Sequence, residues 1–93
     1  MTVMSKIEVE IYTDQGNNAV LQLPNRNYPG VVVQGDSLLN LTRAAESLLK
    51  RAKSFDDEDL TDDAEEVYFG LNDILEELKR VAKESKLDVP YLK

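Results

Sequence analysis

The most constraining feature of this sequence is a segment, residues 62–85, in which apolar side chains recur at steps of three and four. This spacing places apolar residues along one stripe of an α-helix. The stripe consists of Ala64, Val67, Tyr68, Leu71, Ile74, Leu75, Leu78, Val81 and Ala82. Such a helix would be roughly 35 Å long, which is long for a small domain. We therefore expect part of it to project or to pack against a second copy, and Pro90 to stop any helix in the tail.

A second amphipathic segment precedes it at residues 37–54. Its stripe consists of Leu38, Leu41, Ala45, Leu48, Leu49 and Ala52. Asp36 or Ser37 is expected to cap this helix, because either side chain can accept a hydrogen bond from a free N–H of the first turn. Thr61 or Asp59 is expected to cap the later helix for the same reason.

The first third of the chain has the pattern of strands. Residues 6–12 alternate strictly between apolar and polar side chains, which is typical of a strand covered on one face only. Residues 14–18 have the composition of a hairpin turn, and 19–24 and 28–35 form two further predicted strands. The residues expected to face the core are Ile7, Val9, Ile11, Leu21 and Leu23. The sequence thus predicts an α+β fold over a single domain, 1–93: a three-stranded antiparallel meander followed by two helices, with one face of the sheet covered by helices.

Composition argues against several classes of function. The chain has neither His nor Cys, so it lacks the commonest general base, the commonest metal ligands and any disulfide. We expect no enzyme activity, no metal and no cofactor. No apolar run has the length of a membrane span or the form of a signal peptide, so we expect no membrane partner and a cytoplasmic, bacterial location.

Charge is concentrated in one segment. The formal net charge is −7, which opposes nucleic-acid binding. Residues 55–66 contain eight acidic side chains and no basic one. Registers that start at Asp57 or at Asp59 lack the Gly and the Glu that a calcium-binding EF-hand loop requires. Two interpretations stay open: a solvated helix start that matches the helix dipole, or a docking surface for a basic protein partner. The candidate binding residues are Asp56, Asp57, Glu58, Asp59, Asp62 and Asp63.

Four apolar residues complete the candidate partner-binding set. Phe69 is expected on a charged side of the long helix, where it either contacts a partner or is covered by a loop. Tyr12, Val20 and Val32 are expected on the outer face of the sheet. A small sheet with a partly apolar outer face favours binding of another chain or self-association.

Residues 23–52 resemble the N-terminal module of HicB-type antitoxins. The matching positions are Leu23, Pro24, Pro29, Gly30, Gln34, Gly35, Asp36, Ser37, Leu38, Ala44, Ala45 and Leu48. The resemblance implies a β-β-β-α unit that binds a small ribonuclease toxin. Typical members continue into a fourth strand, whereas this chain continues into an acidic segment and a long helix. The chain is also similar to small uncharacterised bacterial proteins that share the Leu-Pro, Pro-Gly and Gln-Gly-Asp-Ser pattern, a similarity that implies no function.

The leading functional hypothesis is a non-enzymatic protein-binding module, an antitoxin or immunity-type neutraliser of a basic partner. The alternative is a small structural or regulatory homodimer. The Gln-Gly-Asp-Ser corner at residues 34–37 is interpreted as structural, because a turn and a helix cap account for each of its residue types.

Overall fold

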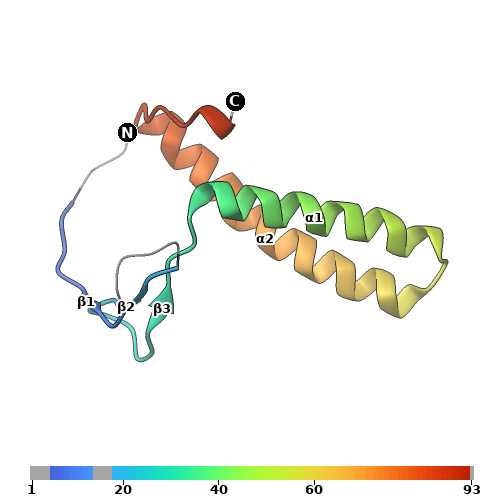
Figure 1. Ribbon diagram of the computed structural model, residues 1–93, viewed down its shortest axis with the longest axis horizontal. Helices are drawn as coiled ribbons and strands as arrows, with labels where there is room; N and C mark the ends of the chain where they lie inside the picture. The colour runs from blue at the N-terminus through green and yellow to red at the C-terminus, as the bar shows by residue number, and fades with distance from the viewer. Residues whose placement is uncertain (1–4, 14–17, 93) are drawn as a thin grey trace. The chain divides into compact units, whose positions relative to one another are not determined.

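The computed structural model describes residues 5–13 and 18–92. Its contacts divide the chain into two compact units, Thr2–Gln34 and Gly35–Lys93, and each is described by itself. The first holds three short strands and the second holds two long helices (Figure 1). This confirms the predicted α+β order, a three-stranded antiparallel sheet followed by two helices. The single domain and the covering of the sheet by the helices stay predictions.

The strands are β1 (Glu10–Ile11), β2 (Val20–Gln22) and β3 (Gly30–Val31), in the order β1-β2-β3. Each is shorter than its predicted segment. The register of β1 against β2 would bring Glu8 opposite Pro24. Because proline has no backbone N–H to donate, the pairing ends before that point.

One face of the sheet has the predicted residues. Ile11 lies directly opposite Leu21, so both side chains project from the same face. Ile7, Ile11 and Leu23, which the sequence pattern assigned to the core, are exposed. The predicted turn at residues 14–18 lies outside the described residues, apart from Asn18.

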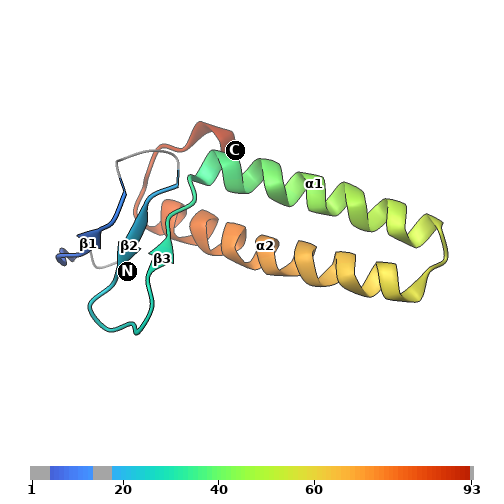
Figure 2. The same cartoon turned by 60° about the horizontal axis from the view of Figure 1, so that its bottom comes forward.

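The helical unit is an antiparallel hairpin. Helix α1 (Gly35–Ser54) has 20 residues and α2 (Glu58–Glu84) has 27, and residues 55–57 connect them. The two helices lie side by side along the whole of α1 (Figure 2). At its full length α2 extends about 40 Å, slightly more than predicted.

Helix α1 begins at Gly35, two residues before the expected start. Asp36 lies in the first turn, and its Oδ1 accepts a hydrogen bond of 2.8 Å from the backbone N–H of Ser37. This bond joins neighbouring residues inside the helix, so it is not the predicted cap, whose side chain would accept from an N–H two or three residues further on. A Cβ at position 35 would lie 2.8 Å from Cδ2 of Leu78 and against the hydroxyl of Tyr91. Gly35 thus permits the close approach of α2 and the C-terminal segment.

The predicted cap of α2, at Thr61 or Asp59, is wrong. Asp57 is the N-cap, with an extended backbone and an Oδ1 that accepts a 3.1 Å hydrogen bond from the N–H of Leu60. Several acidic residues in a row can each serve as a cap, so the sequence alone did not decide among them. Asp56, directly before the cap, has a left-handed backbone with φ 54°.

A local motif also ends α2, well before Pro90. The N–H of Leu87 donates to the carbonyl of Ala82 at 2.9 Å, and the N–H of Lys86 donates to that of Lys83 at 3.3 Å. This is the Schellman pattern, in which the residue after the cap takes a left-handed conformation. Lys86 does so, with φ 55°. Pro90 instead begins a short 3₁₀ helix, Pro90–Leu92.

The core of the hairpin is a narrow seam between the helices. The seam comprises Leu38, Thr42, Ala45, Leu49 and Ala52 of α1 with Ala64, Tyr68, Leu71, Leu75, Leu78 and Ala82 of α2. Its residues are buried, except for Tyr68, Leu71 and Leu78, which are half-buried. They recur at alternating steps of three and four on both helices, which is the repeat of a coiled coil. The one buried polar side chain among the described residues, Thr42, donates its hydroxyl to the carbonyl of Leu38 at 2.8 Å.

Five residues of the predicted apolar stripes lie outside this seam; four of them are exposed, and the fifth, Val81, is half-buried. Leu41, Leu48, Val67 and Ile74 have 52%, 49%, 51% and 58% of their surface exposed. The sequence pattern gave a wide stripe on each helix, but a single partner helix covers only the middle of such a stripe. These four exposed residues therefore extend the apolar stripes beyond the core of the hairpin.

Candidate protein-binding surfaces

The acidic candidates gather at one end of the helical hairpin. We call Asp56, Asp57, Glu58, Asp59, Asp62 and Asp63 the acidic turn; they occupy the connection between the helices and the first turns of α2. All six side chains are exposed. Four of them, Asp56, Asp57, Glu58 and Asp62, line a hollow together with Lys53 and Thr61. The structure therefore brings these predicted residues together on one surface.

The charges of the acidic turn are not balanced by ion pairs. The ion pairs of the described chain join Glu46 to Lys50, Glu76 to Lys79, and Arg80 to two glutamates, all outside the acidic turn. Within the same described residues, no group of three or more acidic side chains has the arrangement of a metal site. Asp57 has a structural role as well, since it caps α2.

A second surface is apolar and was not predicted. We call Leu41, Leu48, Phe55, Leu60, Val67, Ile74 and Val81 the open face; all are exposed except Val81, which is half-buried. Leu41 and Leu48 of α1 are seven residues apart, as are Leu60, Val67, Ile74 and Val81 along α2, and Phe55 lies in the connection directly after α1. Leu48 comes directly before the seam residue Leu49, and Val67 directly before the seam residue Tyr68. The open face is therefore a row of apolar side chains beside the seam.

Both rows of the open face lie on the same side of the hairpin. Two antiparallel helices are related by an approximate two-fold axis that is perpendicular to the plane containing them. Rotation about this axis exchanges the two helices, but a side chain that projects above the plane still projects above it afterwards. The residues that precede the seam on α1 and on α2 thus project from one side. A step of seven in Leu41–Leu48 and in Val67–Ile74, offset by one residue from the seam, was the sequence signal for this surface.

Phe69 lies on the other side of α2. It directly follows the seam residue Tyr68, whereas Val67 precedes it, so the two flank the seam in opposite directions. The rings of Tyr68 and Phe69 have centroids 5.4 Å apart at an interplanar angle of 48°. Phe69 still has 52% of its surface exposed. It packs locally on Tyr68, and its contact with a partner stays a prediction.

The sheet face needs one correction. Val20 lies directly opposite Val31, and the N–H of Tyr12 donates to the carbonyl of Val20 at 2.9 Å. Tyr12, Val20 and Val31 therefore share a face, because side chains of paired residues project together. Val32 is the next residue along and projects from the other face. The predicted set was wrong by one residue at this strand, because the register depends on the preceding loop.

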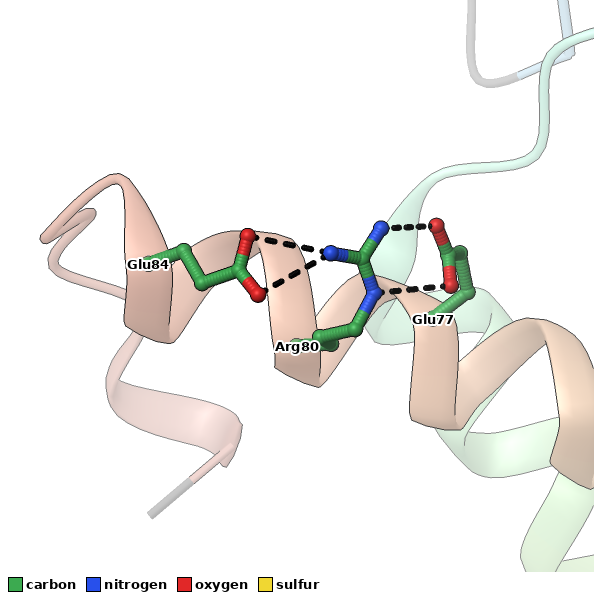
Figure 3. A network of polar contacts seen from close by, with 3 residues as sticks. All are labelled: Glu77, Arg80 and Glu84. Atoms are coloured by element: carbon green, nitrogen blue, oxygen red, sulfur yellow. Dashed lines mark hydrogen bonds and ion pairs between the residues drawn. The ribbon is translucent and has the colours of Figure 1, made fainter. Parts of the chain in front are cut away.

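An exposed polar network lies on α2, away from the acidic turn. Arg80 Nε donates to Glu77 Oε2 at 3.1 Å, and Nη1 donates to both carboxylate oxygens of Glu84 at 3.0 Å (Figure 3). A further bond joins Arg80 Nη2 to Glu77 Oε1. Hydrogen bonding to Arg80 lowers the pKa of Glu77 below its usual 4.5, and both glutamates raise that of Arg80. These are spacings of three and four along one helix, so the network stabilises α2 itself.

Among the described residues, neither long helix combines the length and the apolar character that crossing a membrane requires.

A family model matches residues 4–91, which is nearly the whole chain. The chain belongs to the DUF6959 family. That family is described as a family of unknown function. Neither the curated proteins nor the solved structures contain a match to the chain. The similarity of residues 23–52 to HicB-type antitoxins therefore stays a prediction, and the DUF6959 assignment leaves it untested.

Proposed function

We propose that this protein is a non-enzymatic protein-binding module that neutralises a basic partner, in the manner of an antitoxin or an immunity protein. The observation that supports this most is the acidic turn, six exposed carboxylates gathered outside the ion pairs of the described chain. The exposed ring of Phe55 lies beside them in sequence and offers an apolar contact. On the sequence evidence, we also infer a cytoplasmic, bacterial setting.

The acidic turn would act mainly on the rate of association. A surface of one charge sign attracts a partner of the opposite sign before contact, and can raise the association rate by tenfold or more. Salt screens this attraction within a Debye length, so the rate should fall as ionic strength rises. This predicts a partner whose binding surface is rich in Lys and Arg.

The test uses the full chain and the purified products of the genes next to its own. Binding is measured by surface plasmon resonance at low and at physiological ionic strength. A variant with four neutralised residues spares the cap Asp57; its substitutions are Asp56→Asn, Glu58→Gln, Asp59→Asn and Asp62→Asn. We expect its association rate to fall about tenfold and its salt dependence to flatten.

A matched control carries the same change of net charge elsewhere; its substitutions are Glu8→Gln, Glu10→Gln, Glu66→Gln and Asp73→Asn. We expect a much smaller fall in rate for this variant. Equal effects of the two variants would assign the attraction to net charge and remove the acidic turn from the proposal. Lack of binding to every neighbouring gene product would remove the antitoxin hypothesis itself.

The alternative function, a structural or regulatory homodimer, is supported by a different observation, the open face. Monomeric proteins seldom expose a contiguous apolar row of this length, and such rows are typical of protein interfaces. This alternative does not require a basic partner, and it is compatible with a binding role for the acidic turn at the end of the same hairpin.

A further inference from the structure

We propose that a second copy of this chain docks on the open face, with α1 of each copy lying against α2 of the other, to form a four-helix bundle. The inference rests on the homodimer function proposed above and specifies its geometry. Three independent observations support it: the repeat pattern of the helices, a glycine without an internal role, and the charges beside the open face.

The repeat pattern is that of a bundle helix. A two-stranded coiled coil needs apolar residues only at the seam positions, about two of every seven. Helices in the core of a bundle add a third apolar position beside the seam. Both helices here have that third position filled, in α1 by Leu41 and Leu48 and in α2 by Val67 and Ile74. Each helix therefore has one more apolar row than its partner in the hairpin covers.

Gly70 lies at the outer edge of the open face. It falls three residues after Val67 and four before Ile74, in the middle of α2. A glycine in a helix interior costs about 1 kcal/mol relative to alanine. Apart from the adjoining backbone of its own helix, a Cβ at Gly70 would meet no atom of the described residues within 4 Å, so the packing of the hairpin does not require its absence. A second chain that approaches closely at this point would require it.

The matching position on α1 is also small. Gly35 lies against Leu78, and Glu46 is bonded to Tyr68, and these contacts fix the register of the helices. In that register Ala44 is level with Gly70. Ala44 lies at the outer edge of the α1 row just as Gly70 does on α2. A two-fold axis parallel to the helices would bring Ala44 of one copy over Gly70 of the other, where two helices can approach closely.

Charge selects this arrangement over its alternative. At the outer edge of the open face α1 presents Arg51, whereas α2 presents Asp63 and Glu77. Packing α1 on α1 and α2 on α2 would place acidic edges together. Packing α1 on α2 brings Arg51 level with Asp63 of the second copy, which gives one favourable pair on each of the two outer edges of the bundle. Neither residue takes part in the ion pairs of the described chain.

The first test measures the mass of the full chain in solution by sedimentation equilibrium over a range of concentrations. We expect a dimer. Ile74→Glu places a charge in the centre of the open face and should weaken dimerisation by at least tenfold. Phe69→Glu is the matched control, because Phe69 is similarly exposed but lies on the other side of α2. It should leave the dimer intact. Circular dichroism and a second variant, Leu48→Gln, distinguish loss of the interface from loss of the fold.

The second test examines the pairing of the helices. Arg51→Asp should weaken the dimer by about tenfold, and so should Asp63→Arg. The two substitutions together restore the opposite charges and should restore most of the affinity. Restoration supports the α1-on-α2 arrangement, and a further loss in the double variant would overturn it.

The outcomes separate the inference from the function on which it rests. A chain that is monomeric at every concentration overturns both the homodimer function and this interface. It does so even if a different protein binds the open face. A dimer that withstands both Ile74→Glu and Leu48→Gln leaves the homodimer function standing and overturns the open face as its interface.

Discussion

The hydroxyl of Tyr68 on α2 donates a hydrogen bond of 3.0 Å to Oε2 of Glu46 on α1. This bond spans the two helices at the edge of the seam and joins residues that are 22 positions apart in the chain. It also ties the stability of the hairpin to the protonation of one phenol.

Alkaline pH should weaken the hairpin through Tyr68. The bond to Glu46 is the main cause that raises the pKa of Tyr68 above its usual 10.0, because the neutral phenol is the form that donates. The contribution of this hydrogen bond to folding is therefore complete below the pKa of Tyr68 in the unfolded chain. It is lost as pH rises through the raised pKa of Tyr68 in the folded chain. We expect Tyr68→Phe to lower the melting temperature near neutral pH. Between neutral and strongly alkaline pH, the melting temperature of the variant should fall less than that of the wild type. Thermal unfolding across this range, with the exposed Tyr28→Phe as control, checks the prediction; parallel curves for wild type and Tyr68→Phe would contradict it.

Acid should act through the Arg80 network. Because Arg80 lowers the pKa of Glu77, the contribution of this pair to folding is complete above the usual 4.5 and is lost as pH falls through the lowered value. Arg80→Gln should therefore reduce the melting temperature slightly near neutral pH, since the pair is exposed, and hardly at all in strong acid. Titration of the Glu77 carboxyl by NMR should show its pKa rising in the variant. An unchanged Glu77 titration would mean that the ion pair does not persist in solution.

The helix cap at Asp57 can be separated from the charge of the acidic turn. Asp57→Ala removes the acceptor for the N–H of Leu60 and should cost about 0.5–2 kcal/mol of stability. Asp59→Ala removes the same charge from the first turn without removing the cap, and should cost less. The free energies of unfolding in urea provide the comparison, and equal losses would show that charge near the helix start, rather than the cap, is responsible.

Lys86 is the position where a substitution should stabilise the chain. Its φ of 55° is left-handed, a conformation that is unfavourable for a residue with a Cβ and favourable for glycine. Lys86→Gly should raise the free energy of unfolding by about 0.5–1 kcal/mol. Lys83→Gly, three residues earlier and inside α2, should lower it by about 1 kcal/mol. If both changes lower stability, the Schellman ending of α2 is not the dominant factor at Lys86.

The order of the elements could be predicted from the sequence because hydrophobic period distinguishes strands from helices. Residues 6–12 alternate, whereas 62–85 repeat at three and four, and these periods belong to different backbones. The ends of the helices could not be predicted as well. Asp57, Asp59 and Thr61 are all suitable caps, and only the conformation of the connection selects Asp57.

The location of the core was harder to predict than its composition. Periodicity shows that Leu48, Leu49, Ile74 and Leu75 are on the apolar side of their helices, but it does not show how much of that side a partner covers. In the hairpin Leu49 is 6% exposed and Leu48, its neighbour, is 49% exposed. The open face follows from this difference: the seven-residue steps indicate an apolar row in the sequence, but its exposure could be established only once the pairing of the helices was known.

The three-residue connection between α1 and α2 has a consequence for how fast the chain folds. A short loop closes at little entropic cost, and every seam contact joins residues within one continuous segment. Proteins dominated by such local contacts fold in microseconds to milliseconds. We therefore expect the hairpin to form rapidly after residues 35–84 are available, with its slowest exchanging amide hydrogens in the middle of the seam and the earliest opening at the ends of both helices.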